Sequence, residues 1–520
     1  MTIFSQSNYR PKSYFGSGSV EVAAPARAGE GGIRRLATHK DSLISEPAAG
    51  VRTIPDLIDY AARVHGEREA LGWREVLGVH EEKKTEKGKE KTWKYWDLSP
   101  YKWISYTEFK ERVEDVAKGL VELGIGQEDV VDLFAETSAN WQLMSSACAL
   151  ISTPIATAYD TLGASGLTHS LNEPSCIGIF TNPSLLSMVL KVLSDTPSVR
   201  FVFYDGTPSS AEEETLAKIR KVGASVEGKY GIKKMHITDL LSLGRSRPSI
   251  LLLPNRRPTP DTTACIMYTS GSTGAPKGVV LTHGNLLASV GAVHTVFEPH
   301  LPAGARYIAY LPLAHVLEYV VELCAVFCGV GMGYGRVRTL TGQSIWKGDG
   351  NAEGESDTKK ALGTGLGDLE ELKPDIMLGV PAVWETVRKA VYAKLAKAPK
   401  IAQHAFEAAV RAKKFTSAMS SYTSPSPSAS TGTSGVASAL KWVPDLVTST
   451  VQRGVDGLLD ETILKQVRGA VGGNVKFAVN GGAAVSGETQ EFFAAVGVPL
   501  VQGEFFLLYF SSTSPLFCAS

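Results

Sequence analysis

Short apolar segments alternate with amphipathic ones along much of this chain, and this alternation limits the fold more than any other feature. Strand-like apolar runs occupy residues 129–135, 176–181 and 199–206. Residues 105–125 and 140–152 instead repeat apolar side chains at helical spacing. Strands that alternate with helices form parallel sheets with helices packed on both faces. The sequence therefore predicts an α/β fold.

The segment 105–125 shows the helical spacing most clearly. Ser105 or Thr107 can cap its N-terminus, because a side-chain oxygen there accepts a hydrogen bond from an unpaired backbone N–H. Its apolar face consists of Phe109, Val113, Val116, Leu120 and Leu123. Residues 51–66 show the same spacing and predict an earlier helix.

A second α/β series begins near Thr262. Strands are expected within residues 263–270, 278–282 and 306–313, with a helix starting at His283. A strand, turn and helix follow within 372–395, and another strand runs into glycines within 474–482. We therefore expect one domain over residues 51–503, made of subdomains at about 51–255 and 256–503.

Three segments lack any periodic pattern. Residues 1–50 are rich in Gly, Ser, Ala and Arg and predict a flexible N-terminal arm. Residues 80–94 are a run of mixed charges, which predicts a solvated loop insertion. Residues 416–438 are a Ser/Thr/Pro/Gly tract that cannot support a core, so a second flexible insertion is expected there.

The overall composition is that of a globular intracellular protein. Lys+Arg and Asp+Glu both number 53, so no net field favours nucleic acid or an anionic membrane. The six cysteines lack metal-ligand spacing, and thiols in apolar runs are typical of a reducing compartment. The apolar segment 316–334 contains Glu318 and Glu322, which are costly in lipid. We expect no transmembrane span and no metal site built from protein ligands.

The string YTSGSTGAPKGVVLTHGN, residues 268–285, has the composition of a phosphate-binding loop. Hydroxyls, glycine backbone and the single cation Lys277 suit a polyanion. The string is not a Walker A motif, and it lacks the dinucleotide fingerprint GxGxxG. Pro276 and Gly278 oppose a helix directly after the loop, so a strand–loop–strand arrangement is expected.

This string closely resembles the phosphate-loop signature of the adenylate-forming superfamily. Further blocks occur in the order typical of that superfamily: YLPLAHVLE, GYGRVRTLT, LKPDIMLGVPAVWE and NGGAAVS. The resemblance extends over about residues 50–503 and is to long-chain fatty acyl-CoA synthetases of the fungal type. It implies the large N-terminal domain of that fold, with two stacked α/β subdomains and a small β-barrel portion.

The resemblance implies ATP-dependent activation of a long-chain fatty acid. The carboxylate attacks the α-phosphorus of ATP to give an acyl-adenylate and pyrophosphate, and coenzyme A then displaces AMP. Mg²⁺ is the implied counter-ion of the phosphates. The loop residues implied to wrap the triphosphate are Thr269, Ser270, Gly271, Ser272, Thr273 and Gly274, with Lys277 supplying charge. The adenine is expected against Gly481, Gly482 and Ala483.

Two histidines and one acid beside these motifs have competing interpretations. His315 lies between apolar neighbours, as many core histidines do, but the resemblance places it near the carboxylate and the α-phosphate. Glu318 is interpreted either as a partner behind the site or as a helix-face acid. His283 is interpreted as part of a helix entry, with Asn285 near the cap.

The resemblance stops after Gly503. The family continues with an aromatic–Gly–x–Thr–Glu block, a ribose-binding Asp and a small C-terminal domain, whereas residues 504–520 read EFFLLYFSSTSPLFCAS. We therefore expect impaired activity, and we interpret residues 504–520 as an aberrant tail, such as intron read-through. Two alternatives remain: a non-catalytic remnant that binds nucleotide or fatty acid, and a different acid–CoA ligase of the superfamily. A cytoplasmic location is expected, with peripheral association with the endoplasmic reticulum, lipid droplets or plasma membrane as an option.

Overall fold

A computed structural model describes most of the chain. The described residues are 19–25, 27, 31–86, 89–127, 129–159, 162–225, 231–247, 256–269, 276–346, 365–396, 400, 403–404, 406–407, 410, 468–469, 471–498 and 500–502. The chain forms two units. The larger contains Gly18–Leu77 and Leu98–Val337, and the smaller contains Gly78–Asp97 and Arg338–Phe505. The predicted insertion at 416–438 and the tail at 504–520 lie outside the described residues.

The main sheet of the larger unit confirms the predicted alternation of strands and helices. Its strand order is β11-β10-β9-β7-β8-β12-β13. All neighbours are parallel except the antiparallel pair β12 and β13. The strands are β7 (Val131–Phe134), β8 (Ile155–Thr157), β9 (Gly178–Thr181), β10 (Phe201–Tyr204), β11 (Lys233–His236), β12 (Thr263–Thr269) and β13 (Lys277–Thr282).

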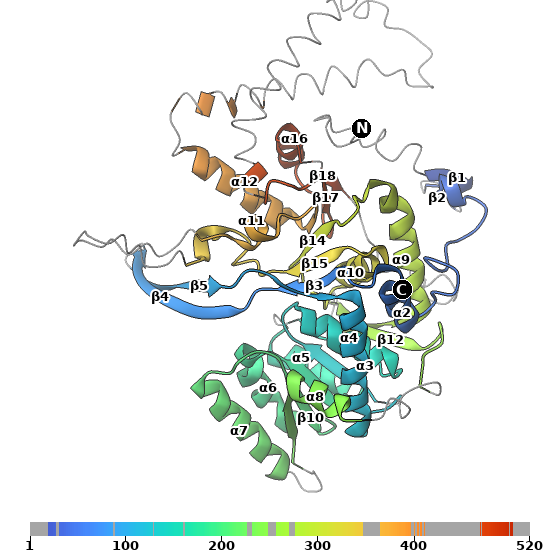
Figure 1. The fold of residues 1–520 in the computed structure, drawn as a ribbon, viewed down its shortest axis with the longest axis vertical. Helices are drawn as coiled ribbons and strands as arrows, with labels where there is room; N and C mark the ends of the chain where they lie inside the picture. Colours follow the sequence, from blue (N-terminus) through green and yellow to red (C-terminus); the bar gives the residue numbers. More distant parts are fainter. Residues whose placement is uncertain are drawn as a thin grey trace, which may run out of the picture. The chain divides into compact units, whose positions relative to one another are not determined.

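In the described part of the chain, five helices connect these strands, and a sixth, α9, follows β13 and leads out of the sheet (Figure 1). They are α4 (Ala139–Leu150), α5 (Gly163–Asn172), α6 (Leu186–Val192), α7 (Ser210–Ser225), α8 (Ile237–Arg245) and α9 (His283–Phe297). A continuous apolar cluster joins residues of the strands to α5, α6 and α7, and includes Phe134, Ile179, Val202, Leu167, Val189 and Leu216. Burial of this apolar surface is the main force that stabilises the layered arrangement.

Helices α2 (Ile54–His65) and α3 (Tyr106–Glu122) precede the strands of this sheet in the sequence. They pack against each other and against α4. Ser105 is the N-cap of α3, and its side chain accepts a hydrogen bond from the Glu108 backbone N–H, 3.2 Å away. Phe109, Val113, Val116 and Leu120 are buried as predicted, whereas Leu123 is the C-cap residue. The helical spacing therefore identified both the helix and its core-facing side.

Four further strands of the larger unit lie in the order β14-β15-β3-β6. They are β3 (Glu69–Trp73), β6 (Lys102–Ser105), β14 (Arg306–Ala309) and β15 (Gly331–Tyr334). The pairs β14–β15 and β15–β3 are parallel, and β3–β6 is antiparallel. Helix α10 (Val316–Cys328) joins β14 to β15 and carries the polar residues discussed below.

The smaller unit has its own parallel strands. They are β16 (Ile376–Gly379), β17 (Phe477–Asn480) and β18 (Leu500–Gln502), paired in this order. The helices described for this unit are α11 (Asp368–Leu372), α12 (Pro381–Ala396) and α16 (Gly487–Ala495). The strands and helix predicted within 372–395 and 474–482 are thus present.

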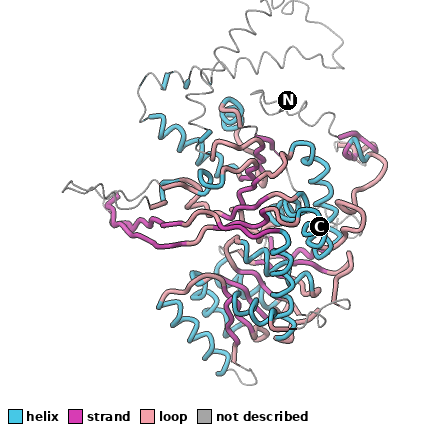
Figure 2. The backbone as a smooth tube through the Cα atoms, in the orientation of Figure 1, coloured by secondary structure: helices cyan, strands magenta, loops and turns pink. Residues whose placement is uncertain are grey.

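The charge run at 80–94 is not the predicted solvated loop. It lies in β4 (Val76–Glu86) and β5 (Lys89–Leu98), which form a two-stranded sheet (Figure 2). Opposite charges meet on this sheet: Lys94 Nζ lies 3.1 Å from Glu81 Oε1, and Lys83 Nζ lies 3.6 Å from Glu90 Oε1. Alternating charges can therefore stabilise a strand pair as well as a loop, since cross-strand ion pairs replace apolar contacts.

Two other expectations need correction. The described part of the N-terminal arm includes the antiparallel strands β1 (Ser19–Ala23) and β2 (Ile33–Leu36). These strands are short and mostly exposed, so no apolar period marks them. Among the described residues the strands form open sheets and no closed barrel: β4 and β5 make a two-stranded sheet, and an isolated bridge joins Trp96 to Ile345. In the same residues, no helix combines the length and apolarity needed to cross a membrane.

The subdomain boundary expected near residue 255 stays a prediction. In the larger unit, β12 and β13 lie after that boundary but complete the sheet built from residues before it. Strands β8 and β12 pair in parallel, with Ile155 opposite Cys265 and Thr157 opposite Met267.

Candidate functional site

The predicted strand–loop–strand arrangement is present at residues 263–282. Strands β12 and β13 are antiparallel, and their last opposed residues are Thr269 and Lys277. Lys277 is exposed, and within the described part of the chain no ion pair joins its ammonium group to an acid. Ser270, Gly271, Ser272, Thr273 and Gly274 lie outside the described residues. An unpaired cation at a strand end is suited to an anion that approaches from solvent.

The other end of β13 has a structural role. Thr282 caps α9 by accepting a hydrogen bond from the Asn285 N–H, 3.2 Å away, and the Asn285 side chain accepts one from the Thr282 N–H at 3.1 Å. His283 is buried, and its Nδ1 accepts a hydrogen bond from the Ile54 N–H at 3.2 Å. Burial lowers the pKa of His283 to about 4, so it is neutral. The interpretation of these residues as a helix entry is confirmed.

His315 is the N-cap of α10 and is only partly buried. Its Nδ1 accepts a hydrogen bond from the Leu317 backbone N–H at 3.1 Å. Burial lowers the pKa of His315, which favours the neutral ring. A neutral ring that accepts at Nδ1 carries its proton on Nε2. His315 therefore offers a single N–H donor on the side away from the helix.

Two threonines hold the turn that precedes His315. Thr137 Oγ1, just after β7, donates to the Leu311 carbonyl at 2.7 Å and accepts from the Leu313 N–H at 2.9 Å. Thr157 Oγ1, at the end of β8, donates to the Ala314 carbonyl at 3.2 Å. Residues at or just beyond the ends of two parallel strands thus fix the backbone that precedes His315. In open α/β sheets, ligands commonly bind at the carboxyl ends of the strands.

Behind His315, α10 buries two carboxyl groups. Glu318 and Glu322 are 1% and 0% exposed. Tyr307 Oη donates to both Glu318 oxygens at 2.8 Å, and Tyr334 Oη donates to Glu322 Oε2 at 2.6 Å. Burial raises the pKa of both acids, and the neighbouring Glu318 raises that of Glu322 further. Both groups are therefore favoured in the protonated, neutral form.

This arrangement decides between the two interpretations of Glu318. The residue is not a surface acid on a helix face, because its side chain is enclosed and bonded to Tyr307. No hydrogen bond joins it to His315 among the described residues. Glu318 instead ties the first turn of α10 to β14, and so it supports the backbone behind the candidate site.

In the smaller unit, the NGGAAVS block begins at Asn480, the last residue of β17. Asn480 is buried, and its Nδ2 donates to the Ala483 carbonyl at 2.7 Å, which closes a tight turn. The Gly481 N–H donates to the Gly379 carbonyl at 3.0 Å. Gly482 has a φ of 79°, a left-handed value that favours glycine. Gly482 and Ala483 are exposed, so their backbone is open to a flat ligand.

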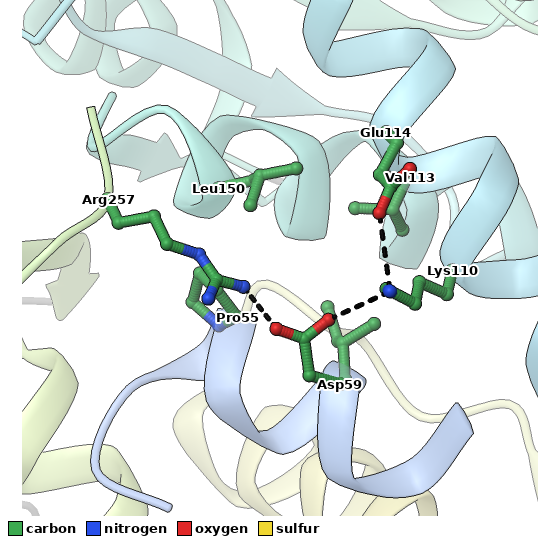
Figure 3. A pocket seen from close by; sticks show the side chains of 8 residues that line it. Pro55, Asp59, Lys110, Val113, Glu114, Leu150 and Arg257 are labelled. Atoms are coloured by element: carbon green, nitrogen blue, oxygen red, sulfur yellow. Dashed lines mark hydrogen bonds and ion pairs between the residues drawn. The ribbon is translucent and has the colours of Figure 1, made fainter. Parts of the chain in front are cut away.

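A separate cavity of about 390 Å³ lies among α2, α3, α4 and Arg257 of the larger unit (Figure 3). Asp59 is bonded to Arg257 there, and Lys110 Nζ lies 3.3 Å from Asp59 and 3.4 Å from Glu114. These charges neutralise one another, and none of the predicted site residues lines the cavity. It does not correspond to the predicted polyanion site.

Sequence reasoning missed the residues that hold the site in place. Thr137 and Thr157 are ordinary threonines in the sequence, and only their position at strand ends could have marked them. Polar residues that follow the carboxyl ends of parallel strands are candidates for a shared site. That signal was available for Thr137, because residues 129–135 are predicted as a strand, but not for Thr157, because no strand is predicted at β8.

Comparison with known proteins gives the class of protein first. The fold matches the adenylation domain of a carboxylate reductase from Mycobacterium chelonae (TM-score 0.56, 20% identity, 88% of this chain and 58% of that chain). It also matches the A-PCP didomain of the carboxylic acid reductase from Segniliparus rugosus, solved with AMP (TM-score 0.59, 18% identity, 89% and 55%). These likenesses establish the fold of adenylate-forming enzymes.

The family follows from the sequence itself. The model for the AMP-binding enzyme family matches residues 81–503, and the chain belongs to that family. It is 31% identical to long-chain-fatty-acid–CoA ligase 2 of Schizosaccharomyces pombe, over 93% of this chain and 62% of the relative. It is 33% identical to long-chain-fatty-acid–CoA ligase 3 of Saccharomyces cerevisiae, over 93% and 64%. The chain thus spans somewhat less than two thirds of these relatives.

Proposed function

We propose that this protein activates long-chain fatty acids by forming an acyl-adenylate from ATP and passing the acyl group to coenzyme A. The observation that carries the proposal is the 31–33% identity, over 93% of the chain, to fungal proteins named as long-chain-fatty-acid–CoA ligases. The proposal includes an adenylation domain over residues 51–503, with the domain boundaries expected from the sequence.

The chemistry needs two displacements. A carboxylate oxygen attacks the α-phosphorus of ATP, the bond to the bridging oxygen breaks, and pyrophosphate leaves with the electron pair. The coenzyme A thiolate then attacks the acyl carbon, and AMP leaves as the phosphate anion. Both steps create or move negative charge, so correctly placed donors and cations account for most of the acceleration.

Each proposed site residue has a role in these steps. Lys277 neutralises phosphate charge, and the Nε2–H of His315 donates to the fatty-acid carboxylate or an α-phosphate oxygen. The adenine lies against Gly481, Gly482 and Ala483. The amides and hydroxyls around the phosphates come from Thr269, Ser270, Gly271, Ser272, Thr273 and Gly274. The exposure of Lys277, Gly482 and Ala483 and the single outward donor of His315 support these roles.

Mg²⁺ enters the proposal only as a counter-ion that ATP brings with it. No group of three or more His, Cys, Asp or Glu side chains that could hold a metal ion occurs among the described residues. Those residues therefore do not fit a metal site of their own, and no step above depends on one.

The test is product formation by the purified 520-residue chain. The chain is incubated with ATP, coenzyme A and octanoate, palmitate, oleate or benzoate, and pyrophosphate and acyl-CoA are measured. Because impaired activity is expected, the proposal expects slow product formation that depends on the acid and is greatest with the long-chain acids. Preference for benzoate would favour a different acid–CoA ligase, and ATP binding without any product would favour a non-catalytic remnant. Robust acyl-CoA production by the chain would contradict the prediction of impaired activity.

Location belongs to the same proposal. Long-chain fatty acids are poorly soluble in water, so a cytoplasmic ligase gains substrate by peripheral association with the endoplasmic reticulum, lipid droplets or plasma membrane. Fractionation of cells that express a tagged protein tests this. Signal confined to a compartment enclosed by a membrane would contradict it.

A further inference from the structure

The two described ends of the phosphate loop are tied to one helix, α5. The incoming side is the end of β12 that leads into the loop, where Tyr268 is the second-last residue of the strand. The outgoing side is the residue that leaves the loop, Pro276, just before β13. Residues 169 and 173 stand one helical turn apart and contact one side each. Side chains spaced by four residues share a helix face. This pair can therefore act on both ends of the loop at once.

His169 holds the outgoing side. Its Nε2 lies 2.9 Å from the Pro276 carbonyl oxygen. A carbonyl oxygen only accepts hydrogen bonds, so Nε2 must carry the proton and donate it. The contact joins residues 107 positions apart in the sequence, and nothing in the local pattern around His169 predicts it.

Glu173 holds the incoming side. Tyr268 Oη donates to Glu173 Oε2 at 2.7 Å, and the Tyr268 side chain is buried. Burial and the Glu173 hydrogen bond raise the pKa of Tyr268, so the phenol keeps its proton and remains a donor. A hydrogen bond to a carboxylate is stronger than one between neutral groups. The C-terminal end of β12 is thereby fixed to the C-terminal end of α5.

The two contacts also meet each other. The same Glu173 Oε2 lies 3.7 Å from His169 Nε2, and the rings of His169 and Tyr268 pack edge to face with centroids 5.6 Å apart. A Cβ at Gly278 would lie only 3.1 Å from Glu173 Oε2. This oxygen is therefore close to both β12 and β13, whose residues Tyr268 and Gly278 are direct partners.

We infer that His169 and Glu173 are positioning residues for ATP, an inference that rests on the proposed function. They fix the spacing and direction of the strand ends between which the phosphate loop runs, and they do not touch the nucleotide themselves. A loop whose ends are already fixed loses less conformational entropy on binding phosphate. Loss of either tether is expected to weaken ATP binding while the fatty-acid site is unchanged.

The main variants separate each hydrogen bond from the packing around it. His169→Phe removes the donor to Pro276 but keeps a ring against Tyr268, and His169→Gln keeps an N–H donor of similar reach. Tyr268→Phe removes only the hydroxyl that Glu173 accepts. Glu214→Gln is the matched control, because Glu214 also pairs at i,i+4 spacing, with Lys218 at 2.8 Å, but on α7.

The primary measurement is the dissociation constant of ATP for the full chain, by titration calorimetry. His169→Phe and Tyr268→Phe should each raise it about 3- to 10-fold, the range expected for one net hydrogen bond. His169→Gln should restore at least half of the loss, and Glu214→Gln should match the unaltered chain. Palmitate binding and the unfolding midpoint are measured on the same samples, and both should change little.

Three results would overturn the inference. If the unaltered chain bound ATP and neither His169→Phe nor Tyr268→Phe weakened that binding, the inference would be wrong. The proposed function would not be affected by that result. Equal losses of ATP and palmitate binding together with a lower unfolding midpoint would show a structural role only. Failure of the unaltered chain to bind ATP would overturn the proposed function and the inference with it.

Discussion

The polar residues of the larger unit that bear on the candidate site occur in two regions that differ in burial. At the loop end of the β12–β13 hairpin Lys277 is exposed, and His169 of α5, which contacts Pro276 there, is partly exposed. On α10 they are enclosed, and Glu318 and Glu322 are almost fully buried. An exposed cation keeps its charge at little cost, whereas a buried acid is favoured in its neutral form. The first region is therefore suited to hold a ligand, and the second to hold the backbone.

This difference in burial predicts which substitutions change ligand binding and which change the free energy of unfolding. Substitutions at the loop end of the hairpin should change ligand binding and catalysis with little effect on folding. Substitutions on α10 should change the free energy of unfolding first, and activity only through the position of His315. The following predictions test this division, starting with the largest expected effect.

The largest effect is expected for Lys277→Ala. Loss of one charge-assisted contact to phosphate should cost about 2–4 kcal/mol in transition-state stabilisation, or roughly 10²–10³ in rate. The free energy of unfolding should not change, because Lys277 is exposed and no ion pair joins it to an acid among the described residues. Acid-dependent pyrophosphate release and urea unfolding measure the two quantities. An unchanged rate, or a clear loss of stability, would break the comparison at the hairpin.

The next effect is expected at Glu318. Glu318→Leu leaves the buried Tyr307 hydroxyl without its acceptor, which should cost about 1–3 kcal/mol of unfolding free energy. The double variant Glu318→Leu/Tyr307→Phe removes both partners and should recover much of that loss. Urea unfolding of the three variants gives the coupling between the residues. If the double variant lost as much stability as the sum of the single ones, the hydrogen bond would not be what links α10 to β14.

The pH dependence of stability is a third test. Burial raises the pKa values of Glu318 and Glu322 above those of an unfolded chain, so the folded state keeps protons that the unfolded state releases. Stability from these acids is complete below the ordinary glutamate pKa of about 4.3 and falls as the pH rises above it. The expected slope is up to about 1.4 kcal/mol per pH unit for each acid that stays protonated.

Glu322→Leu/Tyr334→Phe should make that slope shallower between mildly acidic and mildly alkaline pH. Unfolding free energies of this variant and the unaltered chain, measured across that range, provide the check. Lys277→Ala serves as the control and should leave the slope as it is. Parallel curves for the unaltered chain and the double variant would mean that Glu322 is ionised in the folded protein.

The sequence predicted the elements of the larger unit better than the contacts that orient its site. The apolar period identified α3 and its buried face, and Pro276 and Gly278 correctly indicated a strand after the loop. The bond from Thr137 to Leu311 joins residues 174 positions apart. Such contacts depend on which strand ends meet, and no local pattern encodes that. Strands β4 and β5 were missed for another reason, since their ion pairs form only once the strands are paired.

A smaller effect is expected at Thr137, which is bonded to the turn that precedes α10. Thr137→Val keeps the shape of the side chain but removes the hydrogen bonds to the Leu311 carbonyl and the Leu313 N–H. The turn that carries His315 should loosen, and the adenylation rate should fall about tenfold, as for one to two net hydrogen bonds. Thr137→Ser keeps the hydroxyl and should retain most of the rate. Similar rates for Thr137→Val and the unaltered chain would show that His315 does not depend on this turn.

The smallest effect is expected at the far end of β13, where the same strand that begins at Lys277 ends at the N-cap of α9. Thr282→Ala removes the side-chain acceptor of the Asn285 N–H and should cost about 1 kcal/mol of unfolding free energy. The ATP dissociation constant should not change, because β13 stays paired with β12 through its backbone. Thr282→Ser, which keeps the acceptor, is the control for stability. Urea unfolding and ATP titration on these variants decide whether the two ends of one strand have separate roles. Thr282→Ala could instead reduce the favourable free energy of ATP binding by as much as it reduces the free energy of unfolding. The hairpin would then act as a single unit, and ligand binding could not be assigned to its Lys277 end alone.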